Sequence, residues 1–242
     1  MSLVHILPAG DCALVVEFEN KIAPEVNARV MQLCAAIKGS AIKGVVDFIP
    51  TFRSVLVSYD PLVISYNKLQ KRLQKLSEIK SDAANNTARI FHIPVCYGGE
   101  FGEDIGDVAA HTGLSVDEVV AMHSEKPYLI YMLGFLPGFP YLGGLNEKLF
   151  TPRLPSPRTS IPAGSVGIGG EQTGIYPLAS PGGWRLIGRT PLKPYDAKRE
   201  EPILYAAGDY IKFDPVSETE YNKIEKAVQE NTYTYTIEKR GT

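Results

Sequence analysis

The chain has 242 residues, of which 44% are hydrophobic and 21% are charged, and its formal net charge at pH 7 is −2. This length suits one large domain or two small ones, and it can bury a sizeable core without disulfides or metal ions. The near-neutral charge excludes the strongly basic surface that nucleic-acid-binding proteins use.

The first 80 residues predict a small α+β domain. Short runs rich in Val, Leu and Ile predict four strands, and apolar residues at spacings of three and four predict helices over about 24–38 and 65–78. The order strand, strand, helix occurs twice, which favours a mostly antiparallel sheet with the helices on one face. Residues 81–88 contain no large apolar side chain, so we expect a linker there.

Residues 89–242 predict a second domain that consists mainly of strands. A strand over 89–97 precedes two short helices, over 103–112 and 115–123, and the second helix opens with the Ser and Glu spacing of a capping box. Glycine and proline then interrupt nearly every apolar run, a pattern typical of a β-barrel or sandwich. The last expected elements are two strands on either side of Gly208-Asp209, a helix over 217–229 and a strand over 232–239.

The apolar run 128–145 carries no charge and is long enough by count to cross a membrane. Its second half holds two prolines and four glycines, which disfavour one continuous helix. We therefore expect a buried strand that runs into an apolar loop, and no membrane span.

Cysteine usage and the N-terminal residues both bear on the cellular compartment. The three cysteines lie far apart in the sequence and form no Cys-x-x-Cys pair, which favours free thiols in a reducing compartment. The first residues lack a basic segment followed by a long apolar one, so we expect no signal peptide and a cytoplasmic protein.

Motifs for known chemistry are mostly missing. The sequence contains no phosphate-binding GxxxxGK[ST] loop, no GxSxG nucleophile elbow and no HExxH zinc motif. The four histidines are isolated, so we predict no metal site. His123 precedes the apolar strand and is the one histidine that we expect near a site; the alternative is an ordinary histidine at a helix end.

Residues 149–193 form a cationic segment in an otherwise slightly acidic chain, with five basic residues and one acidic residue. A strand over 184–190 would place Arg185, Ile187 and Arg189 on one face, and two aligned arginines match a carboxylate or phosphate ligand. The alternative is a solvated exterior. Trp184, the only tryptophan, suits either a core position or a ligand platform.

The glycine-rich stretch SVGIGGEQTG, residues 165–174, precedes this tryptophan. A hairpin or tight loop is the favoured interpretation, because no helix start follows the glycines. The backbone N–H groups of residues 164–170 can nevertheless bind an anion in such a loop.

Two long motifs carry a family resemblance. The run GFLPGFPYLGGL at 134–145 and the run LPSPRTSIPAGSVGIGGEQTGIYPLASPGGWRLIGRTPL at 154–192 resemble the KipI family, also called allophanate hydrolase subunit 1. The resemblance covers most of the chain. It implies an α+β N-terminal domain, residues 1–80, followed by a mainly-β cyclophilin-like barrel domain, residues 89–242.

The resemblance also implies a function and partners. Family members include a subunit of an ATP-dependent 5-oxoprolinase complex, which hydrolyses 5-oxo-L-proline to L-glutamate while ATP becomes ADP and phosphate. A KipA-type subunit (allophanate hydrolase subunit 2) and a LamB-type subunit complete that complex, and we expect the isolated chain to be inactive. The family alternatives are an inhibitor of a sporulation sensor histidine kinase and a subunit of an allophanate- or urea-type amidohydrolase or carboxyltransferase.

The candidate site residues follow from this reaction, in which cations and N–H donors must bind phosphate and carboxylate groups. We expect catalytic roles for three residues: Arg158, Gln172 and Tyr176. We expect the following to bind substrate or ATP: His123, Gly164, Ser165, Gly182, Gly183, Trp184, Arg185 and Arg189. ATP is the only co-substrate that we expect, with no metal or prosthetic group.

Overall fold

The computed structural model describes residues 4–79 and 88–239, which form two compact units. The boundary between the units lies between residues 88 and 89. The expected linker over 81–88 lies, except for Ala88, outside the described residues. No described helix is long and apolar enough to span a membrane.

The N-terminal unit is a four-stranded antiparallel sheet with two helices. The strand order is β1-β2-β4-β3. Alternate residues of the two central strands are buried and meet apolar residues of the helices, among them Leu14, Val57, Leu33 and Leu69. The bounds are β1 His5–Pro8, β2 Ala13–Glu17, α1 Pro24–Ser40, β3 Val45–Pro50, β4 Ser54–Tyr59 and α2 Tyr66–Ser77. The predicted order of strands and helices is confirmed.

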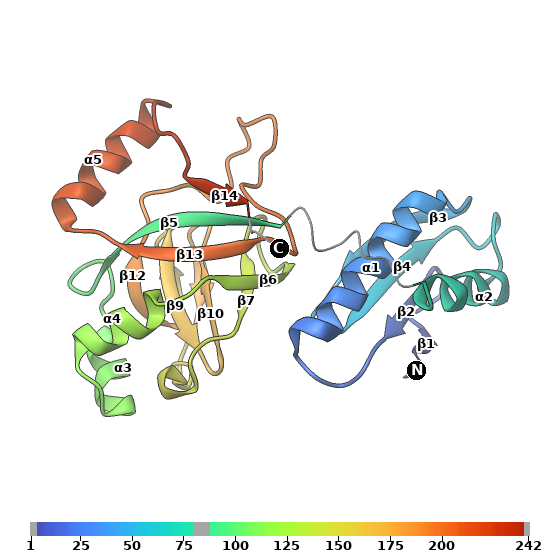
Figure 1. The fold of residues 1–242 in the computed structure, drawn as a ribbon, viewed down its shortest axis with the longest axis horizontal. Coiled ribbons are helices and arrows are strands. Elements are labelled where there is room, and N and C mark those ends of the chain that lie inside the picture. Colours follow the sequence, from blue (N-terminus) through green and yellow to red (C-terminus); the bar gives the residue numbers. More distant parts are fainter. Residues whose placement is uncertain (1–3, 80–87, 240–242) are drawn as a thin grey trace. The chain divides into compact units, whose positions relative to one another are not determined.

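The second unit is a closed β-barrel. Seven strands follow one another in the order β12-β9-β10-β7-β6-β13-β5, and a pairing between β5 and β12 closes the circle (Figure 1). All neighbouring pairs are antiparallel except β13 and β5, which are parallel. The bounds are β5 Arg89–Tyr97, β6 Tyr128–Leu133, β7 Pro140–Gly143, β9 Ser165–Gly169, β10 Gln172–Ile175, β12 Arg185–Arg189 and β13 Tyr210–Pro215.

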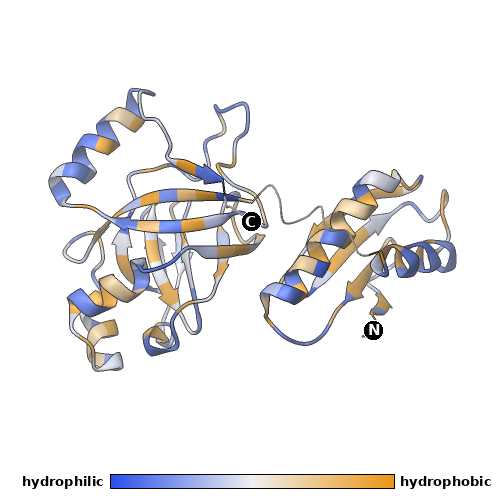
Figure 2. Ribbon diagram, in the orientation of Figure 1, coloured by the Kyte–Doolittle hydropathy of each residue, from blue (hydrophilic) through white to orange (hydrophobic). Residues whose placement is uncertain are grey.

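Further elements cover the barrel. Helices α3 Ile105–Thr112 and α4 Val116–Ser124 add Val108 and Val119 to the barrel core. The expected capping box of α4 is present, since Glu118 N–H donates to Ser115 Oγ and Ser115 N–H donates to Glu118. The remaining elements are η2 Glu147–Leu149, β8 Arg158–Ile161, β11 Ser180–Gly182, α5 Glu218–Gln229 and β14 Ile237–Lys239. Figure 2 shows α2 and α5 as mostly hydrophilic helices. The first buries Leu69 and Leu73, and the second buries Tyr221, Ile224 and Val228.

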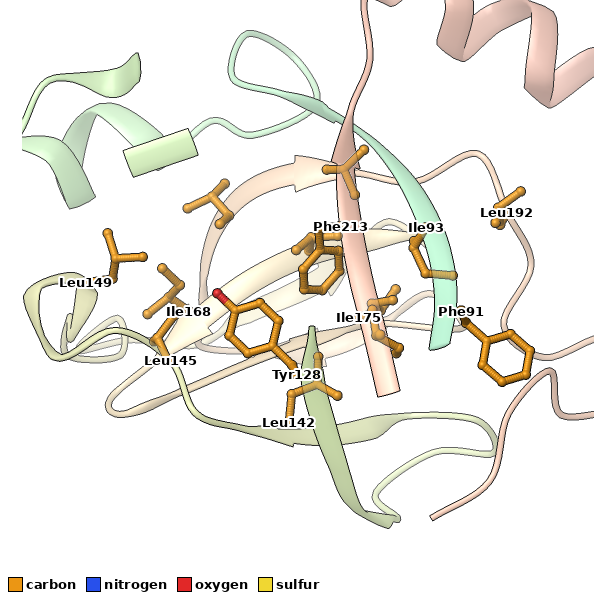
Figure 3. Close-up of a cluster of buried hydrophobic side chains, with 14 of the residues drawn as sticks. Phe91, Ile93, Tyr128, Leu142, Leu145, Leu149, Ile168, Ile175, Leu192 and Phe213 are labelled. Atoms are coloured by element: carbon orange, nitrogen blue, oxygen red, sulfur yellow. The ribbon is translucent and has the colours of Figure 1, made fainter. Parts of the chain in front are cut away.

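The barrel interior is filled with large apolar side chains. Figure 3 shows Tyr128 and Phe213 near the centre of this cluster, with Ile168 and Ile175 contributed by β9 and β10. These two strands therefore direct alternate residues inward, and their remaining residues face outward. That outward face carries the candidate site.

Three expectations about strands need correction or comment. The run 128–145 is β6, a loop and β7, as expected. The strand expected before Gly208 does not form. The side chain of Asp209 accepts a hydrogen bond from Ala206 N–H, which stabilises a turn at this position. The only strand-like pairing nearby, among the described residues, is an isolated bridge between Ile203 and Tyr195. The strand expected over 232–239 is limited to β14, while Tyr233 and Tyr235 pack against the core.

Candidate functional site

Trp184 lies on the outward face of the β9–β10 hairpin and is only 4% exposed. A Cβ atom at Gly169 would overlap the indole ring, and one at Gly174 would lie 2.8 Å from the Pro140 carbonyl oxygen as well as 3.0 Å from Cζ3 of the indole. Because real Cβ atoms essentially never approach so closely, only glycine lets the ring lie against the two strands. The glycine-rich sequence is therefore a packing surface for the tryptophan, and the predicted hairpin is confirmed.

An aromatic cluster extends from this indole. The ring centroids of Phe139 and Tyr176 lie 5.5 Å and 6.1 Å from that of Trp184, both in edge-to-face geometry. Such pairs stabilise the packed arrangement beyond their burial alone. Phe135 stands at the rim, 60% exposed, with its centroid 5.4 Å from that of Phe139. Its φ of 64° is costly for a non-glycine residue, which makes this loop a strained and functionally suggestive feature.

Arg158 and Tyr176 are both neighbours of Gly182, which belongs to a two-stranded ribbon beside the cluster. In this ribbon β8 pairs with β11, and Arg158 lies opposite Gly182. A Cβ atom at Gly182 would lie 2.6 Å from the Tyr176 hydroxyl, so this glycine leaves the space that the hydroxyl occupies. Burial raises the pKa of Tyr176, while a hydrogen bond with the Trp184 backbone and the charges of Arg153 and Arg158 oppose that rise. Tyr176 is therefore neutral at pH 7 and keeps a proton that its hydroxyl can donate.

Three of the expected arginines are anchored by the segment that leads into α3. Arg158 contacts Glu103 and Asp104, with Nε and Nη2 at 3.0 and 2.8 Å from carboxylate oxygens. Arg185 Nη1 lies 2.7 Å from Asp107 Oδ2. Arg189 Nη2 donates to the carbonyl oxygen of Glu100 at 3.1 Å. These guanidinium groups are thus not spread into solvent.

The expectation that Arg185, Ile187 and Arg189 share one face is wrong. The register between β12 and β9 shifts at Ile187, which is an extra residue in a β-bulge and is buried in the barrel core. Arg185 pairs with Ile168 and Arg189 with Ser165, positions three apart on β9 and hence on opposite faces. The two arginines therefore do not form a pair that binds one ligand.

The expectation of free backbone donors over residues 164–170 is also wrong. The N–H groups of Gly164, Ser165 and Gly170 donate to the carbonyl oxygens of Tyr176, Pro162 and Thr151. The residues between them lie in β9, flanked by β10 and β12, where the backbone groups pair with both neighbours. Ser165 is fully buried.

His123 is a core residue, which corrects its expected place near a ligand. Its ring is fully buried, stacks on Phe213, and bonds Tyr97 Oη through Nδ1 and Thr173 Oγ1 through Nε2, both at 2.8 Å. Burial lowers the pKa of His123 to about 3, so the ring is neutral at pH 7. Among the described residues, no three His, Cys, Asp or Glu side chains are grouped so as to hold a metal ion.

Three of the expected residues lie close together: the rings of Tyr176 and Trp184 are in contact, and Arg158 pairs with Gly182, which lies against the Tyr176 hydroxyl. Gln172 is half-buried on the outward face of β10, two residues before Gly174, and it pairs with Gly169 beneath the indole. Gly182 is the last residue of β11, and Gly183 follows it directly before Trp184. The carbonyl oxygen of Gly183 accepts a hydrogen bond from Leu154 N–H.

Sequence reasoning missed three residues of this site. Arg153 was counted only as a charge, yet its guanidinium lies 5.8 Å from the Trp184 ring centroid and has no ion-pair partner within the described part of the chain. Phe135 belongs to the GFLPGFP motif, and from this motif we predicted only that it is an apolar residue in a loop. Asp104 gave no signal, because its partners lie more than 50 residues away in the sequence.

Comparison with known proteins gives close relatives. The family model described as carboxyltransferase domain, subdomain C and D, matches residues 4–205. The B subunit of the 5-oxoprolinase of Bacillus subtilis is 44% identical over 225 residues, which are 88% of this chain and 93% of the relative. The protein of the same name from Escherichia coli O157:H7 is 45% identical over 210 residues, covering 86% of this chain and 94% of the relative. The expected family resemblance is confirmed.

Solved structures agree with the expected fold class. The urea amidolyase of Kluyveromyces lactis superimposes with a TM-score of 0.82 over 98% of this chain. At 24% identity, and with only 16% of that much longer protein covered, this match concerns the fold alone. An uncharacterized protein from Pyrococcus horikoshii is 46% identical, with a TM-score of 0.54 over 90% of this chain and 100% of the other. An α+β unit followed by a mainly-β barrel unit is thus the arrangement that the sequence predicted.

Proposed function

Because this chain belongs to the family of carboxyltransferase domains, subdomains C and D, we propose that it is the B subunit of an ATP-dependent 5-oxoprolinase. The observation that carries the proposal is the 44% identity to a protein of that name over 88% of the chain. The complex hydrolyses 5-oxo-L-proline to L-glutamate, and ATP is converted to ADP and phosphate.

The reaction explains which groups the site needs. A lactam carbonyl is a poor electrophile, and transfer of a phosphoryl group from ATP to its oxygen activates it towards water. Both substrates bring oxyanions: the carboxylate of 5-oxoproline and the phosphates of ATP. Cations and neutral hydrogen-bond donors that are already fixed in place stabilise such charges best. Arg158, with Tyr176 beside it, provides both kinds of group.

We assign roles to the residues of the outward face on this basis. Arg158 binds an oxyanion, Tyr176 donates a hydrogen bond to the same ligand, and Gln172 orients an amide or a water molecule. Trp184, which packs against Gly169 and Gly174, supports these side chains. The exposed Arg153 contributes positive charge. Arg185 and Arg189 are assigned to holding α3, since they are bound to Asp107 and to the carbonyl of Glu100.

A subunit that acts only in a complex fits the features of this surface. The sequence has no GxxxxGK[ST] phosphate-binding loop, and we propose that another chain of the complex contributes the nucleotide-binding loop. Phe135 offers an exposed aromatic ring at the rim of the site, the kind of group that protein partners bury. We propose a KipA-type and a LamB-type subunit as these partners. Inhibition of a histidine kinase stays a prediction, and no feature of residues 4–79 or 88–239 favours it.

Omitting the chain from the reconstituted complex tests the proposal. The chain and its two candidate partners are purified separately, mixed with ATP and 5-oxoproline, and assayed for L-glutamate and phosphate. We expect the full mixture to release glutamate only with ATP, and the mixture without this chain to be at least about 100-fold slower, since an incomplete site loses charge stabilisation. Equal glutamate release with and without the chain would contradict the assignment.

A further inference from the structure

We propose that Asp104 is a positioning residue, which holds the Arg158 guanidinium so that its Nη1 atom is directed to bind an oxyanion of the substrates. This inference rests on the proposed function and goes beyond it, because it assigns a role to a carboxylate on a different element from the site. The ligand group is either a carboxylate or a phosphate.

Asp104 links two strands through one buried carboxylate. The residue is 5% exposed. Its Oδ1 atom accepts a hydrogen bond from Arg158 Nη2 at 2.8 Å, and its Oδ2 atom accepts one from Leu186 N–H at 2.7 Å. Its own N–H donates to the carbonyl oxygen of Leu186 at 2.9 Å. The start of α3 is thereby bound to β12 at two points, and Asp104 cannot move without breaking them.

Two of the three Arg158 nitrogens are fixed, and the third is not used. Nε contacts the exposed Glu103 at 3.0 Å and Nη2 contacts Asp104. Nη1 is buried and has no hydrogen-bond partner among the described residues. A buried donor without a partner is costly, and a charged donor more so. The hydrogen bond from Arg158 to Asp104 also raises the pKa of Arg158, so the group stays charged whether or not a ligand is bound.

The surroundings of Arg158 suit an oxyanion. Gly182 pairs with Arg158 and lacks the side chain that would otherwise lie against the Tyr176 hydroxyl. A planar guanidinium held on one edge by carboxylates presents its remaining N–H groups in a fixed direction, which favours carboxylate or phosphate oxygens. The Tyr176 hydroxyl interacts with the Trp184 backbone and with the charges of Arg153 and Arg158, and its own proton can serve as a second donor.

A purely structural role for Asp104 predicts a different outcome from a positioning role. Asn at this position keeps an oxygen that can accept the Leu186 N–H, but it removes the charge that holds Arg158. Asp107 is the matched control: it lies three residues further along the same segment and pairs with Arg185, and its side chain is 64% exposed. Exposed ion pairs contribute little to stability or position.

The test measures kcat and the KM values for 5-oxoproline and ATP in the complete complex. We expect Asp104→Asn to raise one of the two KM values about tenfold, with kcat changed less, and Asp107→Asn to leave both within twofold. A rise in the 5-oxoproline KM identifies a bound carboxylate, and a rise in the ATP KM identifies a bound phosphate. In an Arg158→Ala background, Asp104→Asn should have no further effect on that KM.

The inference is overturned if Asp104→Asn changes neither KM, or if its effect is equally large in the Arg158→Ala background. If Asp104→Asn does not fold, the KM values of Arg158→Lys test the inference instead. Lysine keeps the positive charge, but its single nitrogen cannot contact two carboxylates and also bind the ligand in a fixed direction. An unchanged KM in that variant would also overturn the inference. An inactive wild-type complex would instead contradict the proposed function.

Discussion

Replacing Arg158 by alanine is expected to lower kcat/KM of the complex for 5-oxoproline at least about 100-fold. Removal of a single fixed donor that stabilises developing negative charge typically costs a factor of 10² to 10³. Arg158 is half-buried, and its Nη1 atom has no hydrogen-bond partner among the described residues, so a ligand that binds there replaces no existing hydrogen bond. The measurement is steady-state glutamate release with each substrate varied in turn.

Arg185→Gln is the matched comparison for this variant. Like Arg158, Arg185 forms an ion pair with a carboxylate near the start of α3, but the side chain of its partner, Asp107, is exposed. Because of the bulge in β12, Arg185 and Arg189 lie on opposite faces of the strand. We expect Arg185→Gln to retain activity within about threefold, because its partner Asp107 is 64% exposed and an ion pair with an exposed partner contributes little. Equal losses in the two variants would mean that positive charge over the whole cationic segment, and not the Arg158 contact, determines activity.

Acidification is expected to destabilise the barrel unit through His123. The folded-state pKa of this ring is about 3, lowered from 6.5 by burial. The unfolded chain therefore binds a proton near pH 6.5, whereas the folded chain does not until about pH 3. Stability from the neutral ring is complete above pH 6.5 and is lost progressively as the pH falls towards 3. Between pH 7.5 and 5.0 the loss amounts to about 2 kcal/mol.

His123→Gln isolates this contribution, because glutamine does not titrate. Urea unfolding at pH 7.5 and at pH 5.0 can be followed through Trp184, which is the only tryptophan and lies in the barrel unit. The variant should be less stable than the wild type at pH 7.5, but it should lose about 2 kcal/mol less on acidification. His111→Gln, at an exposed position on α3, should keep the wild-type pH dependence. Identical pH dependence in His123→Gln and wild type would contradict the account.

Local sequence signals predicted the elements of the fold well. The apolar spacing over residues 24–38 anticipated α1, and Ser115 with Glu118 located the start of α4. The prolines and glycines of 128–145 correctly excluded a single helix. Each of these signals depends on residues close in sequence, where the geometry of a helix or turn restricts the choice of side chain.

The features that the sequence did not predict depend on contacts between residues far apart in the chain. The bulge at Ile187 belongs to the pairing of β12 with β9, and no periodicity within β12 encodes it. The arginines appeared free because their partners, residues 100–107, lie more than 50 positions away from Arg158. The glycine-rich run resembled an anion-binding loop, yet its glycines are required by the indole of Trp184, which packs across them. His123 was misplaced because burial is a property of the closed barrel.

The central claim is that the outward face around Trp184 contacts substrate in the assembled complex. Because the chain has one tryptophan, 5-fluorotryptophan labelling of this subunit gives a single fluorine NMR resonance from the middle of that face. In a complex with unlabelled partners, saturating 5-oxoproline with a non-hydrolysable ATP analogue should shift the resonance by more than its line width, and Arg158→Ala should abolish the shift. A resonance that stays unchanged in a complex shown to be active would contradict the claim.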